Sequence, residues 1–291
     1  MGKRKIRIAD TTLRDGQQSP GLAFSPETSL RMMEMLDDLG VSRVEVATPP
    51  AGPGEFQIVR DLKCRLKNAK MVSWNRLRMS DAEASLRLEP HAVHLCFPVS
   101  EPQLRKKLKI SFDEAGTLLA ELVETVAGAG AEVSVGLEDV SRATPERLAE
   151  AKALLRKLRV DNLRLSDTVG ILTPGRTAAL VEFFRGEKYA LEFHAHNDLG
   201  MAVPNSLMAA LSGADHIDTT LLGVGERAGN ASLSGFLRLC AMSPLLETDV
   251  DLEEALFLEE TFSSLLNRDE YLDSLMNSPA SDITEFAGEN V

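Results

Sequence analysis

The segment His194-Ala-His196-Asn-Asp198 places two imidazoles close together at the end of an apolar run, Tyr189 to Phe193. Residues two apart on a β-strand project to the same face. We therefore expect His194 and His196 to aim at one point, an arrangement that suits a divalent metal ion. The alternative is a pair of polar residues in an ordinary strand-to-loop exit.

Two further segments offer ligands of other types. Asp10-Thr-Thr-Leu-Arg-Asp-Gly16 ends the first predicted strand and places the Asp15 carboxylate beside the Arg14 guanidinium. Gly223-Val-Gly-Glu-Arg-Ala-Gly-Asn230 follows the last predicted strand, although Asn230 is also a suitable helix N-cap. Imidazole, carboxylate and amide ligands together suit Mg²⁺, Mn²⁺, Zn²⁺ or Co²⁺, and ligand type alone does not choose among them.

The elements that must position these groups alternate regularly between strand and helix. The pattern predicts eight strands, each followed by a helical stretch such as Glu27–Leu39 or Phe56–Leu66. The predicted strands are Ile6–Thr12, Arg43–Ala47, Ala69–Trp74, Ala92–Val99, Glu132–Leu137, Asn162–Leu165, Ala190–His196 and His216–Leu222. This order predicts an α/β fold, a (β/α)8 TIM barrel. An open doubly wound sheet is the alternative, but the first strand is not followed by a G-x-G-x-x-G motif.

A closed barrel would bring the candidate ligands together. Active sites in this fold lie at the carboxyl ends of the strands, and strands seven, eight and one are neighbours. Asp15, His194, His196 and Asn230 are therefore expected to surround one ion.

Other strand ends also carry polar residues, for each of which a structural ion pair or cap is the alternative role: Glu45, Glu138, Asp139, Arg142, Ser166, Asp167 and Thr168. Glu192 shares the face of His194 and is expected to support it.

Composition excludes some classes of protein. The 291 residues carry a net charge of −12, which argues against a general nucleic-acid binder. The three cysteines are scattered, so neither a zinc ribbon nor a disulfide scaffold is indicated. We find no signal peptide and no membrane-spanning run, and we expect a cytoplasmic protein.

Three motifs in order give the chain a family resemblance: Asp10 to Gln18 with Pro20-Gly21, His194 to Gly200, and Gly223 to Asn230. Together they resemble the isopropylmalate and homocitrate synthases, which are pyruvate-carboxyltransferase-like metallolyase barrels. The segments Val133–Arg142 and Leu165–Gly170 match as well. The strand end Ser73–Arg76 and the segment Pro98–Ser100 look most like the homocitrate synthases of nitrogen-fixing bacteria.

The resemblance implies an acyltransferase that joins acetyl-CoA to a 2-oxo acid by a Claisen-type condensation. The metal would chelate the oxo acid and make its carbonyl carbon electrophilic. Arg14 would stabilise the negative charge that grows on the oxygen, with a salt bridge as its alternative role. Thr168 would donate to the substrate carboxylate. Glu138 and Glu45 match family positions associated with proton transfer, and the sequence does not decide which one is the base.

Substrate choice depends on the tail of the oxo acid. A homocitrate synthase must bind the distal carboxylate of 2-oxoglutarate, for which Arg76 and Arg105 are the candidates. An isopropylmalate synthase would instead need an apolar pocket. The basic run from Arg105 to Lys109 has two other interpretations, contact with CoA phosphates or a solvated surface. By family likeness we also expect a homodimer.

The chain departs from the family pattern at two places. Gln17 stands where Glu is common, and only about fifty residues follow Cys240. Full synthases continue into a region that supplies a His and a Tyr to the base, whereas no His follows His216 here. We expect a catalytic barrel over residues 1–242 and a short helical extension over 243–291, with helical stretches at Leu252–Leu266 and Arg268–Met276.

The short end keeps other functions open. A lyase of the hydroxymethylglutaryl-CoA type is disfavoured because Gly223 to Asn230 contains no Cys. An oxo-acid decarboxylase or aldolase on the same metal site is a second alternative. A non-catalytic subunit that binds an oxo acid is the third, and it predicts binding without turnover.

Overall fold

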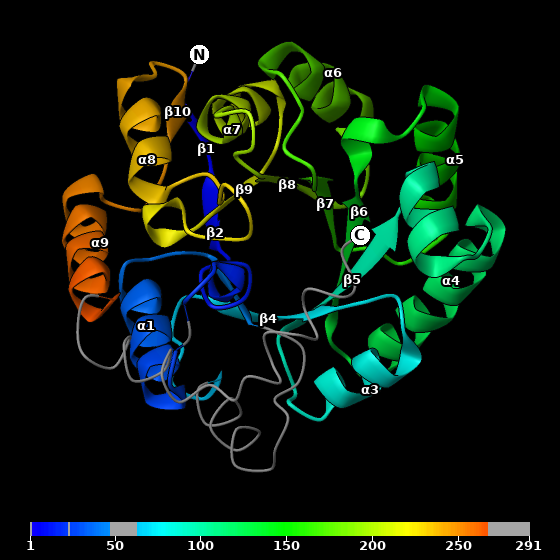
Figure 1. The fold of residues 1–291 in the computed structure, drawn as a ribbon, viewed down its shortest axis with the longest axis horizontal. Coiled ribbons are helices and arrows are strands. Elements are labelled where there is room, and N and C mark those ends of the chain that lie inside the picture. Colours follow the sequence, from blue (N-terminus) through cyan, green and yellow to red (C-terminus); the bar gives the residue numbers. More distant parts are fainter. Residues whose placement is uncertain (1, 23, 47–62, 267–291) are drawn as a thin grey trace.

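The computed structural model describes residues 2–22, 24–46 and 63–266 and contains the expected closed barrel (Figure 1). All neighbouring barrel strands are parallel, in the order β2 to β9. The strands are β2 (Arg7–Asp10), β3 (Arg43–Val46), β4 (Lys70–Asn75), β5 (Ala92–Pro98), β6 (Glu132–Glu138), β7 (Asn162–Asp167), β8 (Ala190–Ala195) and β9 (His216–Thr219).

Helices surround the barrel on its outer side (Figure 1). They are α1 (Pro26–Asp38), α3 (Met79–Leu86), α4 (Phe112–Gly128), α5 (Pro145–Leu155), α6 (Pro174–Phe184), α7 (Ala202–Ser212), α8 (Leu233–Met242) and α9 (Leu252–Leu266). Local sequence sets their starts: Ser111 and Glu114 form a reciprocal capping box on α4, and the Thr144 hydroxyl caps α5. The predicted Phe56–Leu66 helix falls largely outside the described residues, and the Arg268–Met276 stretch falls wholly outside them.

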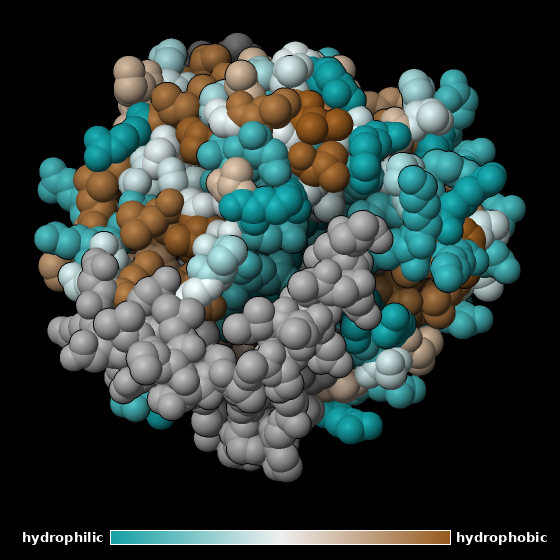
Figure 2. Space-filling view, viewed as in Figure 1, coloured by the Kyte–Doolittle hydropathy of each residue, from teal (hydrophilic) through white to brown (hydrophobic). Residues whose placement is uncertain are grey.

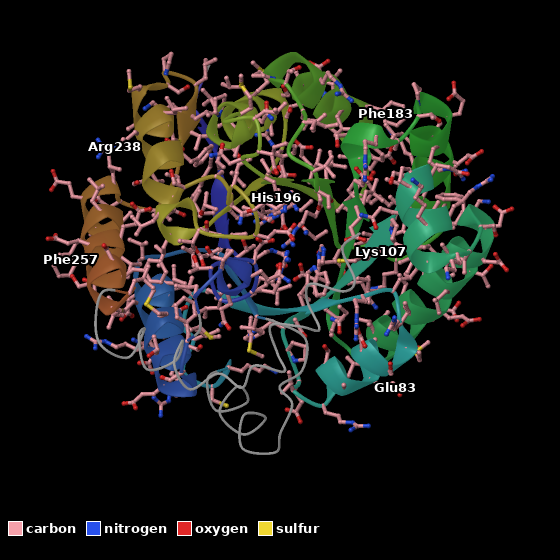
Figure 3. The ribbon with its side chains drawn as sticks, in the orientation of Figure 1. Glu83, Lys107, Phe183, His196, Arg238 and Phe257 are labelled. Carbon is pink, nitrogen blue, oxygen red and sulfur yellow. The ribbon has the colours of Figure 1, made fainter. Side chains whose placement is uncertain are left out.

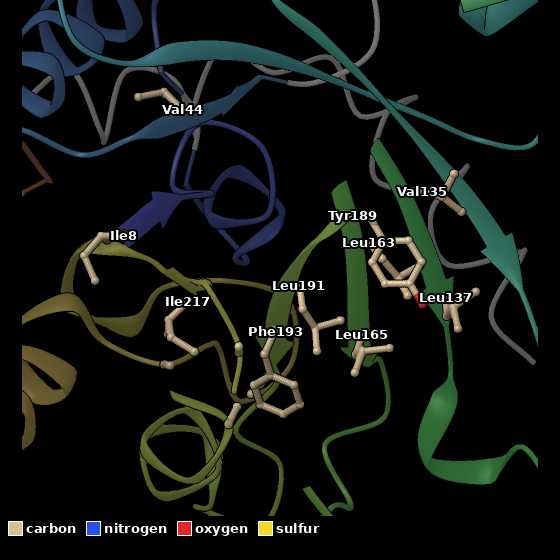
Figure 4. Packing of buried hydrophobic residues seen from close by; sticks show 14 of the residues in the cluster. Ile8, Val44, Val135, Leu137, Leu163, Leu165, Tyr189, Leu191, Phe193 and Ile217 are labelled. Atoms are coloured by element: carbon tan, nitrogen blue, oxygen red, sulfur yellow. The ribbon is translucent and has the colours of Figure 1, made fainter. Parts of the chain in front are cut away.

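The apolar core lies between the strands and the helices. Leu163, Leu165, Leu191 and Phe193 are buried in this layer (Figure 4), and in the strands they alternate with polar residues. Because successive side chains of a strand point to opposite faces, the polar set faces the barrel axis. The interior of this barrel is therefore charged and hydrogen-bonded, and its polar groups must be paired to be stable there.

The segment after α8 also packs onto the barrel. Strand β1 (Arg4–Lys5) pairs in parallel with β10 (Leu246–Glu247), a pairing that the sequence pattern did not predict. On α9, Phe262 is fully buried and meets Phe24, with 5.8 Å between ring centroids. The division at residue 242 stays a prediction. None of the described helices is both long and apolar enough to cross a membrane.

Candidate metal centre

Asp15, His194 and His196 converge at the carboxyl ends of the strands. The Nε2 atoms of His194 and His196 lie 3.3 Å apart. Asp15 Oδ2 lies 3.5 Å from His194 Nε2 and 3.8 Å from His196 Nε2. All three side chains are buried. Ligand atoms that share one ion at about 2.1 Å from each of them are themselves about 3–3.5 Å apart. The three donors therefore have the spacing of a metal site.

Each donor is placed by the end of a strand. His194 lies within β8, and His196 follows its last residue, where it forms an antiparallel bridge with Asn230. Asp15 lies in a turn after β2, in which its backbone N–H donates to the Thr11 carbonyl at 2.8 Å. The loop that carries Asn230 thus lies across the end of β8. Figure 3 shows His196 near the middle of the ring of strands and helices.

Asn230 completes the set that the sequence predicted. Its Nδ2 donates to Asp15 Oδ1 at 2.9 Å and to the Val224 carbonyl at 3.0 Å, while its Oδ1 is buried without a hydrogen-bond partner. An orphaned amide oxygen beside a carboxylate and two imidazoles is a suitable donor for a divalent cation. A Cβ at Gly225 would lie 2.1 Å from Asn230 Nδ2, so that position requires glycine.

The charged groups of the centre shift one another's pKa values. Burial raises the pKa of Asp15, but Arg14 and the two imidazoles outweigh it and hold that pKa well below its usual range. Burial lowers the pKa of His194, yet hydrogen bonds to Asp15 and Asp218 raise it to about 9. Burial and the neighbouring His194 lower the pKa of His196 to about 3. His194 must therefore lose a proton before it binds a metal.

Arg14 lies between two carboxylates beside the centre. Its Nη1 donates to Asp15 Oδ2 at 2.9 Å and its Nε donates to Glu45 Oε1 at 2.7 Å. The guanidinium carbon also lies 4.9 Å from the centroid of the Trp74 ring. The predicted salt bridge of Arg14 is thus present, and it aims the guanidinium at the metal centre.

The two glutamates differ in their surroundings. Glu45 is buried, but Arg164 and Arg14 overcome the desolvation and lower its pKa to about 2. Burial raises the pKa of Glu138, although Lys107 and Arg14 oppose the rise. At neutral pH Glu138 is therefore the stronger base of the two.

Thr168 lies after β7, where its hydroxyl accepts from the Asp139 backbone N–H at 2.9 Å. Because this contact uses an oxygen lone pair, the hydroxyl proton stays able to donate. Asp139 itself accepts from Ser100 and from Arg142, so its carboxylate serves a structural ion pair. This pair was the alternative role considered for Asp139.

The structure does not bring Arg76 and Arg105 to the metal centre. Arg76 donates to Asp81 at 2.8 Å and is 57% exposed, and Arg105 pairs with Glu101 and is 79% exposed. Arg105 belongs to an unpredicted π-helical turn, Pro102–Leu108. Both arginines contact acidic residues four or five positions away, so local pairs hold them at the surface.

Sequence reasoning missed two residues around the centre and misplaced a third. Asp218 accepts from His194 Nδ1 at 3.0 Å, and Glu226 Oε1 lies 3.6 Å from His196 Nε2. Glu192 contacts Asn162 and Arg164 in place of His194. The alternation of polar residues in β9 was the available signal for Asp218, and the signal for Glu226 was its place in the Gly223 to Asn230 motif. Figure 2 shows hydrophilic residues along the upper side of the hollow in this face.

The chain is similar to several known proteins. A model of the HMGL-like family matches residues 5–261. A putative (R)-citramalate synthase of Methanopyrus kandleri is 36% identical over 79% of the chain and 46% of its own length. A homocitrate synthase of Frankia alni is 37% identical over 87% of the chain and 72% of its own length. A probable 2-isopropylmalate synthase of M. kandleri is 34% identical over 88% of the chain and 51% of its own length.

The chain thus spans about half the length of two of these three relatives. Among solved structures, an HMG-CoA lyase of Bacillus subtilis superimposes with a TM-score of 0.80 over 92% of the chain and 96% of its own length, at 19% identity. That likeness confirms the TIM barrel.

Proposed function

The chain belongs to the HMGL-like family, and on this premise we propose that it is an acyltransferase that condenses acetyl-CoA with a 2-oxo acid. The proposal depends on one observation above all: the donors Asp15, His194 and His196 lie within 4.8 Å of one another, beside the Arg14 guanidinium. The names of the homocitrate and isopropylmalate synthase relatives support the same reaction class.

Asp15, His194, His196 and Asn230 would hold the divalent cation, which is Mg²⁺, Mn²⁺, Zn²⁺ or Co²⁺ by ligand type. When bound, such an ion polarises a carbonyl group as a Lewis acid. Arg14 donates hydrogen bonds toward the negative charge that develops on the keto oxygen as the new carbon–carbon bond forms.

Glu138 is our proposed base. It takes a proton from the acetyl methyl group, whose carbon then bonds to the keto carbon of the oxo acid. The keto double bond opens to an alkoxide that takes up a proton, and water then cleaves the thioester to a carboxylate and the free CoA thiol. Glu45 is the weaker candidate because its two oxygens contact Arg14 and Arg164 and its pKa is lowered to about 2. The Thr168 hydroxyl donates to the carboxylate of the oxo acid.

For the oxo acid itself we propose 2-oxoglutarate, on the strength of the Frankia relative, of whose length the chain covers 72%. One observation favours a second candidate, an oxo acid with an uncharged tail as in an isopropylmalate synthase. Within the described residues, the barrel arginines Arg14, Arg43 and Arg164 all pair with carboxylates of the protein. These three guanidiniums are therefore already engaged and do not offer an obvious partner for the distal carboxylate of 2-oxoglutarate.

A substrate panel tests the proposal. The purified chain is incubated with acetyl-CoA, Mn²⁺ or Mg²⁺, and either 2-oxoglutarate, 2-oxoisovalerate or pyruvate, and the released CoA thiol is measured. We expect release with one oxo acid and none from His196→Ala. Silence on the whole panel, with Mn²⁺ binding intact, would instead favour the non-catalytic oxo-acid-binding subunit.

The Arg105→Ala variant tests whether Arg105 selects the substrate. The sequence predicts that the variant loses more of its rate of thiol release with 2-oxoglutarate than with 2-oxoisovalerate. The exposed pairing of Arg105 with Glu101 predicts equal rates of the variant and the unsubstituted protein on both. Equal rates would remove Arg105 from substrate selection.

A further inference from the structure

Arg164 is a buried cation at the centre of the barrel, and its side chain is 3% exposed. It extends from the middle of β7 to carboxylates on three other strands. Its Nη2 lies 2.6 Å from Glu45 Oε2, its Nε lies 2.9 Å from Asp218 Oδ2, and it also contacts Glu192. Since β3, which carries Glu45, lies on the opposite side of the barrel from β7, this contact crosses the interior.

The first of these contacts leads to Arg14. Glu45 binds Arg164 through Oε2 and accepts from Arg14 Nε through Oε1 at 2.7 Å. Arg14 in turn donates to Asp15 at 2.9 Å. One carboxylate therefore fixes the distance between the buried cation and the guanidinium beside the metal centre.

The second contact leads to His194. Asp218 Oδ2 lies 2.9 Å from Arg164 Nε and 3.0 Å from His194 Nδ1. A hydrogen bond on Nδ1 fixes the orientation of the ring and leaves Nε2 for a metal. His194 Nε2 does face Asp15 Oδ2, at 3.5 Å.

Both chains of contacts begin at one guanidinium and meet again at Asp15. A planar guanidinium can bind several carboxylates in fixed directions, whereas a lysine ammonium is a compact point charge on a flexible stem. The third carboxylate, Glu192, is held on its other side by Asn162 Nδ2 at 2.9 Å. The geometry thus requires the planar guanidinium of an arginine at this position, and a lysine of the same charge would not make the same contacts.

We propose that Arg164 is a positioning residue that sets both the metal ligand His194 and the oxyanion donor Arg14. The proposal rests on the metal site described under the proposed function. Arg164 acts through Asp218 on the metal affinity and through Glu45 on the oxo-acid affinity. Arg164 itself touches neither metal nor substrate.

The test compares Arg164→Lys with Arg43→Lys by calorimetry on the full chain. Arg43 is a matched control because it is also buried, at 5% exposure, lies on β3 and pairs with Glu132 away from the metal centre. We expect Arg164→Lys to weaken Mn²⁺ binding at least about tenfold, as for other residues that support a metal ligand. Binding of 2-oxoglutarate or 2-oxoisovalerate to the Mn²⁺ form should weaken as well. Arg43→Lys should leave both affinities within about twofold of the unsubstituted protein.

A double-mutant cycle separates positioning from a general structural role. In an Asp218→Asn background, Arg164→Lys should cause no further loss of Mn²⁺ affinity, because the path to His194 is already broken. An equal loss in both backgrounds, or a folded Arg164→Lys protein with unchanged Mn²⁺ affinity, overturns the proposal. If Arg164→Lys does not fold, the charge-balanced pair Arg164→Gln with Glu192→Gln replaces it under the same criteria.

These readouts do not depend on turnover. Loss of Mn²⁺ affinity in Arg164→Lys together with silence on the substrate panel would overturn the proposed condensation and leave the positioning role standing. Unchanged Mn²⁺ affinity in Arg164→Lys, together with thiol release by the unsubstituted protein, would overturn the positioning role and leave the proposed condensation standing.

Discussion

Replacing the Asp15 carboxylate with an amide is the most direct perturbation of the candidate metal centre. Asp15→Asn keeps the shape of the side chain and removes its charge. In the metal-free protein that charge pairs with Arg14 at 2.9 Å, with side-chain exposures of 10% and 2%. Removing one partner of a buried pair costs about 3–5 kcal/mol. We expect a loss of about 3 kcal/mol in the free energy of unfolding, because Glu45 still pairs with Arg14.

The effect on metal affinity should be similar in size. Removing a residue that merely supports a ligand weakens metal binding by about 10–100-fold, and we propose that Asp15 itself supplies a ligand atom. We therefore expect the Mn²⁺ dissociation constant to rise at least about 100-fold, which corresponds to about 2.7 kcal/mol.

Calorimetric titration with Mn²⁺ and urea unfolding measure these two quantities separately. Asp37→Asn is the matched control, since Asp37 is a buried carboxylate that accepts from backbone N–H groups of Lys67, Asn68 and Ala69. It should lower the free energy of unfolding and leave Mn²⁺ affinity unchanged. A folded Asp15→Asn protein that binds Mn²⁺ within about threefold of the unsubstituted protein would refute the ligand assignment.

Further outcomes are expected at four other residues. The pKa of His194 is raised to about 9 in the metal-free protein, so Mn²⁺ affinity should rise about tenfold per pH unit between about pH 7 and 9; a flat calorimetric profile would contradict this. The same shift stabilises the metal-free fold fully below pH about 6.5, and urea unfolding should show that stabilisation declining as the pH approaches 9. Burial raises the pKa of Asp10 from 3.8 to about 7, so the folded chain keeps a proton that the unfolded chain has lost, and stability should fall between those pH values. Asp10→Asn should therefore be more stable than the unsubstituted protein at pH 8, by up to about 4 kcal/mol in urea unfolding, and a destabilised variant would argue against a raised pKa of Asp10. Thr168→Val should weaken oxo-acid binding about tenfold in calorimetry without changing Mn²⁺ affinity, since one hydrogen bond to a charged group is worth about 1.5–3 kcal/mol. Glu138→Gln should abolish thiol release while oxo-acid binding persists, and retained turnover would return Glu45 to the role of base.

The barrel followed from the sequence because its signals are local. The regular alternation of short apolar runs with helical stretches predicted the eight strands, and residues such as Ser111 and Thr144 cap the helices that follow. The parallel pairing of β1 with β10 was missed because two residues per strand carry no periodicity.

The convergence of the candidate ligands could be predicted for a related reason. His194 and His196 are two apart, and in a closed barrel the ends of strands seven, eight and one are neighbours, so Asp15 and Asn230 could be added before any distance was known. The roles of Arg76 and Arg105 could not be predicted in the same way. A long side chain in a loop or turn after a strand can point inward or outward, and in this structure both side chains contact a nearby acidic residue and are more than half exposed.

Residue types and their spacing along the chain were enough to predict the fold, the rim on which the polar side chains gather, and the four candidate ligands that meet there. Only the tertiary structure decided which charged side chains pair with one another across the barrel. Glu45, Arg164 and Asp218 lie on different strands, at separations in sequence that no local pattern links, and they meet because barrel closure turns alternate side chains onto one axis. Buried charges must find partners, and the identity of those partners is a property of three-dimensional packing.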